Sequence, residues 1–87
     1  MIEREATIVN DLGLHARPAA ELVKLASRFD SEVEIVKDTV AVNAKSIMGV
    51  MMLAAETGSS VIFRAEGPDA EAAVQALADL VAAGFGE

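Results

Sequence analysis

The chain contains one histidine, and its neighbours could support chemistry on an anionic group. His15 is followed by Ala16, Arg17 and Pro18, a pattern that predicts the first turn of a helix. A neutral imidazole is a nucleophile, and its attack on phosphorus gives a phosphoramidate that can release the group again. The unpaired N–H groups of a helix start attract anions, and the Arg17 guanidinium adds a charged fork for phosphate oxygens. These residues therefore predict a site that accepts and releases a phosphoryl group.

The same residues have a plainer interpretation, which residue types alone favour because isolated histidines and arginines are common. In that interpretation the His15 side chain caps the helix and Arg17 is a solvated surface charge. The chain also has no cysteine, which excludes thiolate chemistry and disulfides. With a single histidine as well, we expect neither a metal site nor a cofactor.

Ser46 stands at a second predicted helix start, of a short helix that we expect to run to about Ala55. A serine N-cap, which typically stabilises a helix by about 1 kcal/mol, is a sufficient explanation of its presence. Phosphorylation there would add nearly two negative charges, which the helix dipole tolerates. Such a change would leave the fold intact and act on partners.

The short helix after Ser46 is apolar almost all round, so it cannot bury every face on a small domain unless it is deeply enclosed. We assign Val50, Leu53 and Ala54 to the core. The remaining apolar side chains then form an exposed patch, which usually marks a binding surface. This set, called the apolar patch below, is Ile47, Met48 and Met51.

Hydrophobic periodicity predicts an alternation of short strands and helices. We expect an α+β fold with the order βαββαβα, an open-faced sandwich whose mainly antiparallel four-stranded sheet has its helices on one face. Asp69 is the predicted N-cap of the last helix and Gly84 its C-cap. The strands are expected at residues 2–9, 32–37, 40–43 and 60–66, and the helices at 16–29, 46–55 and 70–83.

Alternation and helical spacing also select the residues that should face the core. The list is Leu22, Val23, Ala26, Phe29, Val33, Ile35, Val61, Phe63, Ala65, Ala73, Val74, Leu77, Leu80 and Val81.

Length and charge limit the function classes. With 87 residues, we expect a single domain over residues 1–87. A net charge of −7 argues against nucleic acid and anionic membranes as partners. The start of the sequence lacks the pattern of a signal peptide, and the longest apolar run without glycine, Val50 to Ala55, is too short to span a bilayer. We therefore expect a cytoplasmic protein.

Two segments of the sequence resemble motifs of one family. Residues 13–19, Gly-Leu-His-Ala-Arg-Pro-Ala, resemble the active-site signature of HPr, the histidine-containing phosphocarrier of the phosphoenolpyruvate:sugar phosphotransferase system. Residues 45–51, Lys-Ser-Ile-Met-Gly-Val-Met, resemble the regulatory serine segment of the same family in its Gram-positive type. The resemblance extends over essentially the whole chain, and the family has the same order of elements.

The resemblance implies that the chain is a carrier and not an enzyme. His15 would accept a phosphoryl group on Nδ1 from phosphorylated Enzyme I and pass it to the A component of an Enzyme II during sugar uptake. Arg17 would hold the phosphate, and Ser46 would be the substrate of an HPr kinase/phosphorylase, with a catabolite-control transcription factor as a further partner. We expect a monomer that meets these partners through the apolar patch and a helix face formed by Ala16, Ala20 and Lys24.

Three other functions stay open. The segment Gly84-Phe85 is similar to the nitrogen-related paralogue of the phosphocarrier. A second alternative is a mainly regulatory binding module that acts through Ser46. The third, a small ligand-sensing domain, ranks last because the sequence contains no polar cluster suited to a pocket.

Overall fold

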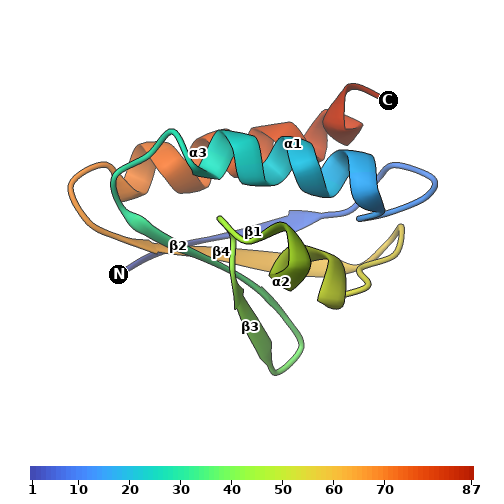
Figure 1. Cartoon of the computed structure of the whole chain (residues 1–87), viewed down its shortest axis with the longest axis horizontal. Helices are drawn as coiled ribbons and strands as arrows, with labels where there is room; N and C mark the ends of the chain where they lie inside the picture. Colours follow the sequence, from blue (N-terminus) through green and yellow to red (C-terminus); the bar gives the residue numbers. More distant parts are fainter.

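A four-stranded antiparallel sheet organises the computed structural model, which describes residues 1–87 (Figure 1). Its strand order is β1-β4-β2-β3, and every neighbouring pair is antiparallel. Helices α1 (Ala16–Ala26) and α3 (Ala70–Ala82) lie together over one face of the sheet, and the short α2 (Ile47–Met52) packs against α1. The predicted fold class is thereby confirmed. The strands are β1 (Ile2–Thr7), β2 (Glu32–Lys37), β3 (Val40–Asn43) and β4 (Ser60–Glu66).

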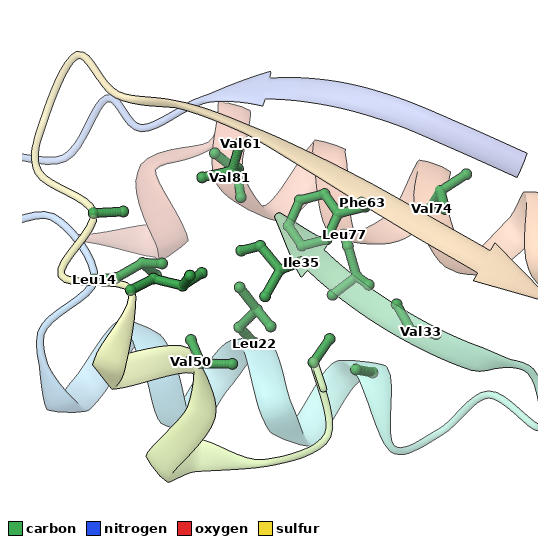
Figure 2. Close-up of a cluster of buried hydrophobic side chains, with 14 of the residues drawn as sticks. Leu14, Leu22, Val33, Ile35, Val50, Val61, Phe63, Val74, Leu77 and Val81 are labelled. Atoms are coloured by element: carbon green, nitrogen blue, oxygen red, sulfur yellow. The ribbon is translucent and has the colours of Figure 1, made fainter. Parts of the chain in front are cut away.

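The core lies between the sheet and the two long helices. Alternate residues of β2 and β4 point into it, as the period of a strand requires. Figure 2 shows Ile35 and Phe63 from the sheet in one cluster with Leu22 of α1 and Leu77 of α3, and all four side chains are fully buried. Burying a side chain of this size contributes about 1.5–3 kcal/mol, so this layer fixes the position of α1 on the sheet.

Helix α1 ends earlier than its hydrophobic pattern indicates. The prediction extended it to Phe29, but the last helical residue is Ala26. The N–H of Phe29 donates to the carbonyl of Ala26 at 3.2 Å, a turn of the tighter i→i+3 type. Phe29 and Val23 are only partly buried, whereas Pro18 and Ala19, which the prediction did not assign to the core, are buried.

Helix α2 is also shorter than predicted, since it ends at Met52 and not near Ala55. Val50 and Leu53 are buried as expected. The assignment of Ala54 to the core is wrong: this residue is exposed and has φ 49°, a left-handed conformation that reverses the chain direction. The turn places Ala55 in the core in its stead, with 3% of its surface exposed.

Asp69 occupies the N-cap position of α3, but the predicted capping hydrogen bond is absent. Its carboxylate instead accepts from the backbone N–H groups of Asp30 and Ser31, both at 2.9 Å, and from the Ser31 hydroxyl at 2.5 Å. The Ser31 oxygen in turn accepts from the Asp69 N–H at 3.1 Å. These contacts join the start of α3 to the turn that follows α1.

The end of α3 lies close to the prediction. Ala83 is its C-cap, and Gly84 comes one position later with φ 65°, the left-handed conformation that commonly terminates helices. Leu80 is only partly buried, while the other predicted core residues of this helix are fully buried. None of the helices has both the length and the apolarity needed to cross a bilayer.

Candidate functional site at the start of the first long helix

His15 is the N-cap residue of α1, and its side chain does not cap the helix. Its backbone is extended, with φ −76° and ψ −174°, and the imidazole makes no hydrogen bond to the first turn. The plainer interpretation of His15 as a capping residue is therefore wrong. The N–H groups of Ala16 and Arg17 have no intrahelical acceptor, and Pro18 has no N–H at all. The helix start beside the imidazole is consequently open to an anion.

The loop before His15 is held in place by backbone contacts. Gly13 has φ 66°, and a Cβ added there would lie 2.4 Å from the carbonyl oxygen of Ala55. The same oxygen accepts the N–H of Leu14 at 2.9 Å, and the Leu14 side chain is buried. Asn10 adds a hydrogen bond from its Nδ2 to the Gly13 carbonyl at 2.8 Å. His15 therefore projects from a loop fixed at both ends.

Glu87 is the residue of this site that the sequence analysis missed. Its Oε2 lies 3.0 Å from Nε2 of His15, and its Oε1 accepts from Nδ2 of Asn10 at 3.0 Å. Glu87 and Arg17 line one surface depression together with His15. No local signal could reveal this contact, because His15 and Glu87 are 72 positions apart in the sequence.

Ser46 is the N-cap of α2 and does cap its helix. Its Oγ accepts from the N–H of Gly49 at 3.2 Å, and its carbonyl accepts from the N–H of Val50 at 2.9 Å. The capping role predicted for Ser46 is confirmed. The residue is partly exposed, so its hydroxyl is not enclosed in the core.

The apolar patch is exposed on α2, as predicted. Ile47, Met48 and Met51 have 40%, 70% and 41% of their surface exposed, and Met52, which the prediction left out, has 77%. The alternative of a deeply enclosed helix is therefore wrong.

On α1, Ala16 and Lys24 are exposed and Ala20 is partly buried. Because α1 and α2 contact each other, the docking residues predicted on the two helices belong to neighbouring elements.

This open-faced sandwich, with a histidine at an uncapped helix start, is the architecture of a small phosphocarrier domain. A family model described as the PTS HPr component phosphorylation site matches residues 2–83. The chain belongs to the HPr family of phosphocarrier proteins, which are shuttles of the phosphotransferase system and not catalysts.

Individual relatives agree with this assignment. The phosphocarrier protein HPr of Cupriavidus necator is 52% identical over 87 residues, which cover 100% of this chain and 98% of that protein. The crystal structure of HPr from Thermoanaerobacter tengcongensis superposes with a TM-score of 0.96 at 50% identity, covering 100% of this chain and 98% of that chain. A dimer form of that HPr superposes with a TM-score of 0.80 and covers all of both chains. The phosphocarrier protein NPr of Shewanella violacea is 44% identical over 99% of this chain and 94% of that protein.

Proposed function

We propose that His15 is the phosphoacceptor of this carrier, taking the group from phosphorylated Enzyme I and passing it to A components of Enzyme II during sugar uptake. The observation that carries the proposal is the uncapped start of α1 directly beside the imidazole. A helix that gives up a capping bond leaves its first N–H groups available to a ligand, and phosphate is the ligand such a site suits best.

In the proposed reaction, the lone pair of His15 Nδ1 attacks the phosphorus atom while the bond from phosphorus to the donor's nitrogen breaks. The phosphoryl oxygens then lie near the N–H groups of Ala16 and Arg17, and the exposed Arg17 guanidinium can turn toward them. Transfer onward reverses the same steps on the next protein. The site supplies a nucleophile and an anion-binding helix start.

Partner recognition is proposed to use α1 and the apolar patch. Arg17 and Lys24 are exposed cations on a chain with a net charge of −7, so they can steer acidic partner surfaces toward His15. Ala16 and Ala20 would allow close approach, and the apolar patch would supply the desolvated centre of the contact. We propose that the chain acts in the cytoplasm as a monomer, although the related Thermoanaerobacter protein has also been crystallised as a dimer.

Labelling tests the phosphoacceptor directly. The chain is incubated with Enzyme I, magnesium and radioactive phosphoenolpyruvate, and we expect an acid-labile label that His15→Ala abolishes. Arg17→Ala should slow labelling by about 10- to 100-fold, since a hydrogen bond to a charged group is worth about 1.5–3 kcal/mol. Arg28→Ala, which removes another exposed cation beyond the end of α1, is the matched control and should change the rate little. Equal labelling of His15→Ala would overturn the proposal.

A second proposed function is regulation through Ser46. Its hydroxyl is partly exposed and stands next to the apolar patch, so a phosphate there would place charge on the surface that partners contact. An HPr kinase/phosphorylase would add it, and a catabolite-control transcription factor would read it. A nitrogen-related branch is the alternative, which the similarity to NPr of Shewanella violacea supports.

Charge at Ser46 can be imitated by substitution. We expect Ser46→Asp to slow phosphoryl transfer from Enzyme I while the free energy of unfolding stays near that of the unmodified chain, because aspartate also caps helices. Ser46→Asn is the matched control, with similar size and capping ability but no charge. If both variants transfer at the original rate, charge at this position does not govern the encounter. A variant without His15 that keeps every regulatory response would favour the purely regulatory module.

A further inference from the structure

We infer that Glu87 is a positioning residue for His15, whose side-chain carboxylate accepts the Nε2–H and so keeps the lone pair on Nδ1. The inference rests on the proposed role of His15 as phosphoacceptor and extends it to the residue that prepares the ring. The contact that carries it is the 3.0 Å separation between Glu87 Oε2 and His15 Nε2.

The carboxylate is fixed by more than its contact with the ring. Its second oxygen accepts from Nδ2 of Asn10 at 3.0 Å, and Asn10 has only 7% of its surface exposed. The same Asn10 amide group binds the Gly13 carbonyl, so the carboxylate is tied to the loop that carries His15. Phe85, at φ 59° and 8% exposed, anchors the turn that brings Glu87 back across the site.

This arrangement selects one tautomer. An ionised carboxylate only accepts hydrogen bonds, so the ring nitrogen that faces it must carry the hydrogen. The hydrogen therefore belongs on Nε2 of His15, and Nδ1 keeps its lone pair for phosphorus. Asp11 and Arg17 are the other charged residues that line the same depression, and neither is bonded to the ring.

The Glu87 carboxylate also stabilises the positive charge that the His15 ring acquires during transfer. When the Nδ1–phosphorus bond forms, the ring becomes positively charged while its hydrogen stays on Nε2. Glu87 faces this charge through a charge-assisted hydrogen bond. When the bond breaks again, its electron pair returns to Nδ1 and the ring is neutral, so no proton needs to move in either direction.

Ring nitrogen spectra test the inference on the unphosphorylated chain. At alkaline pH, where imidazole is neutral, we expect the ¹⁵N shifts of His15 to report hydrogen on Nε2 and a free lone pair on Nδ1. Glu87→Gln, whose amide can donate as well as accept, should move both shifts toward an averaged mixture of tautomers. Asn10→Ala should give a smaller change in the same direction, because it releases one carboxylate oxygen. Glu66→Gln, an exposed carboxylate outside the depression, is the matched control.

Transfer kinetics complete the test. Glu87→Gln and Glu87→Ala should accept the phosphoryl group about 3- to 10-fold more slowly, because each loses one charge-assisted hydrogen bond at a partly solvent-exposed position. Glu87→Asp, which keeps the carboxylate, should restore part of the rate. Unchanged ring shifts and rates in Glu87→Gln, with normal labelling of His15, would overturn the inference and leave the proposed function standing. Undiminished labelling of His15→Ala would overturn the proposed function and leave the ring spectra interpretable.

Discussion

The starts of α1 and α2 have similar backbones and opposite chemistry. Both N-cap residues are extended, but Ser46 turns its hydroxyl onto the N–H of Gly49, whereas His15 turns its ring away toward Glu87. One helix start is closed by its own side chain, and the other is left open. A capping bond is worth about 1 kcal/mol, so α1 forgoes local stability at the position where an anion would bind.

The two helices differ in what else supports them. Helix α1 has 11 residues and buries Pro18, Ala19, Leu22 and Ala26, while α2 has six residues and buries only Val50. Short isolated helices are marginal, and most helical stability in proteins comes from packing. The long helix can therefore leave its start open, whereas the short one depends more on its cap.

The largest expected effect concerns the loop that presents His15. Gly13→Ala should lower the free energy of unfolding by more than about 2 kcal/mol, because it combines left-handed strain with a collision against the Ala55 carbonyl. Gly58→Ala is the matched control: Gly58 also has a positive φ, 89°, but an added Cβ would meet nothing within 4 Å. It should cost about 1 kcal/mol. Urea unfolding measures both, and equal losses would mean that the contact with Ala55 does not fix the loop.

A smaller effect should distinguish the two caps. Ser46→Ala is expected to cost about 1 kcal/mol, and Ser46→Asn much less, since asparagine also caps. At the open start of α1, a capping side chain should add stability that the natural residue does not supply. His15→Asn should therefore be about 1 kcal/mol more stable than His15→Ala. Urea unfolding of each pair of variants measures these differences in stability, through the shift between their midpoints. Equal stability of the two His15 variants would show that the first turn of α1 is already satisfied.

The smallest effect is expected at the start of α3, where the Asp69 carboxylate makes no hydrogen bond to its own helix. Hydrogen bonds, above all from the Ser31 side chain and then from the Asp30 backbone, hold the pKa of Asp69 below its usual range. A carboxylate whose pKa is lower in the folded state stabilises the fold fully at pH values above its unfolded-state pKa. That stability is lost as the pH falls toward and through the folded-state pKa, here below about pH 4. Asp69→Asn should flatten this acid-side loss in a series of unfolding curves, while Asp79→Asn should not. Identical acid profiles for both variants would rule out Asp69 as the source.

Most of the local structure could be predicted from the sequence, but few of the long-range contacts could. The bounds of β2, β3 and β4 were predicted as observed, because alternation and turn residues are local signals. The positions of His15 and Ser46 at helix starts follow from their immediate neighbours in the same way. Helix ends were less predictable, since Phe29 keeps the helical spacing beyond Ala26, and apolar residues continue beyond Met52, while the backbone turns.

The missed contacts share a physical reason. His15 meets Glu87 across 72 positions and Ser31 meets Asp69 across 38, so both depend on how the sheet brings distant segments together. Asp69 is the N-cap residue of α3 as expected, but its carboxylate bonds to donors of Asp30 and Ser31 in the turn after α1 and not to its own helix. The exposed apolar patch was recognised because α2 has more apolar residues than a short helix can bury.

The strand order has a consequence for how the chain folds. Strand β4 lies between β1 and β2, which do not pair with each other, so the sheet is divided until residues 60–66 are in place. Strand β1 and the β2–β3 hairpin therefore cannot complete the sheet before the central strand joins them. Contacts of such high sequence separation form slowly. We therefore expect the loop that carries His15, which is bonded to Ala55 shortly before β4, to gain its final shape late in folding.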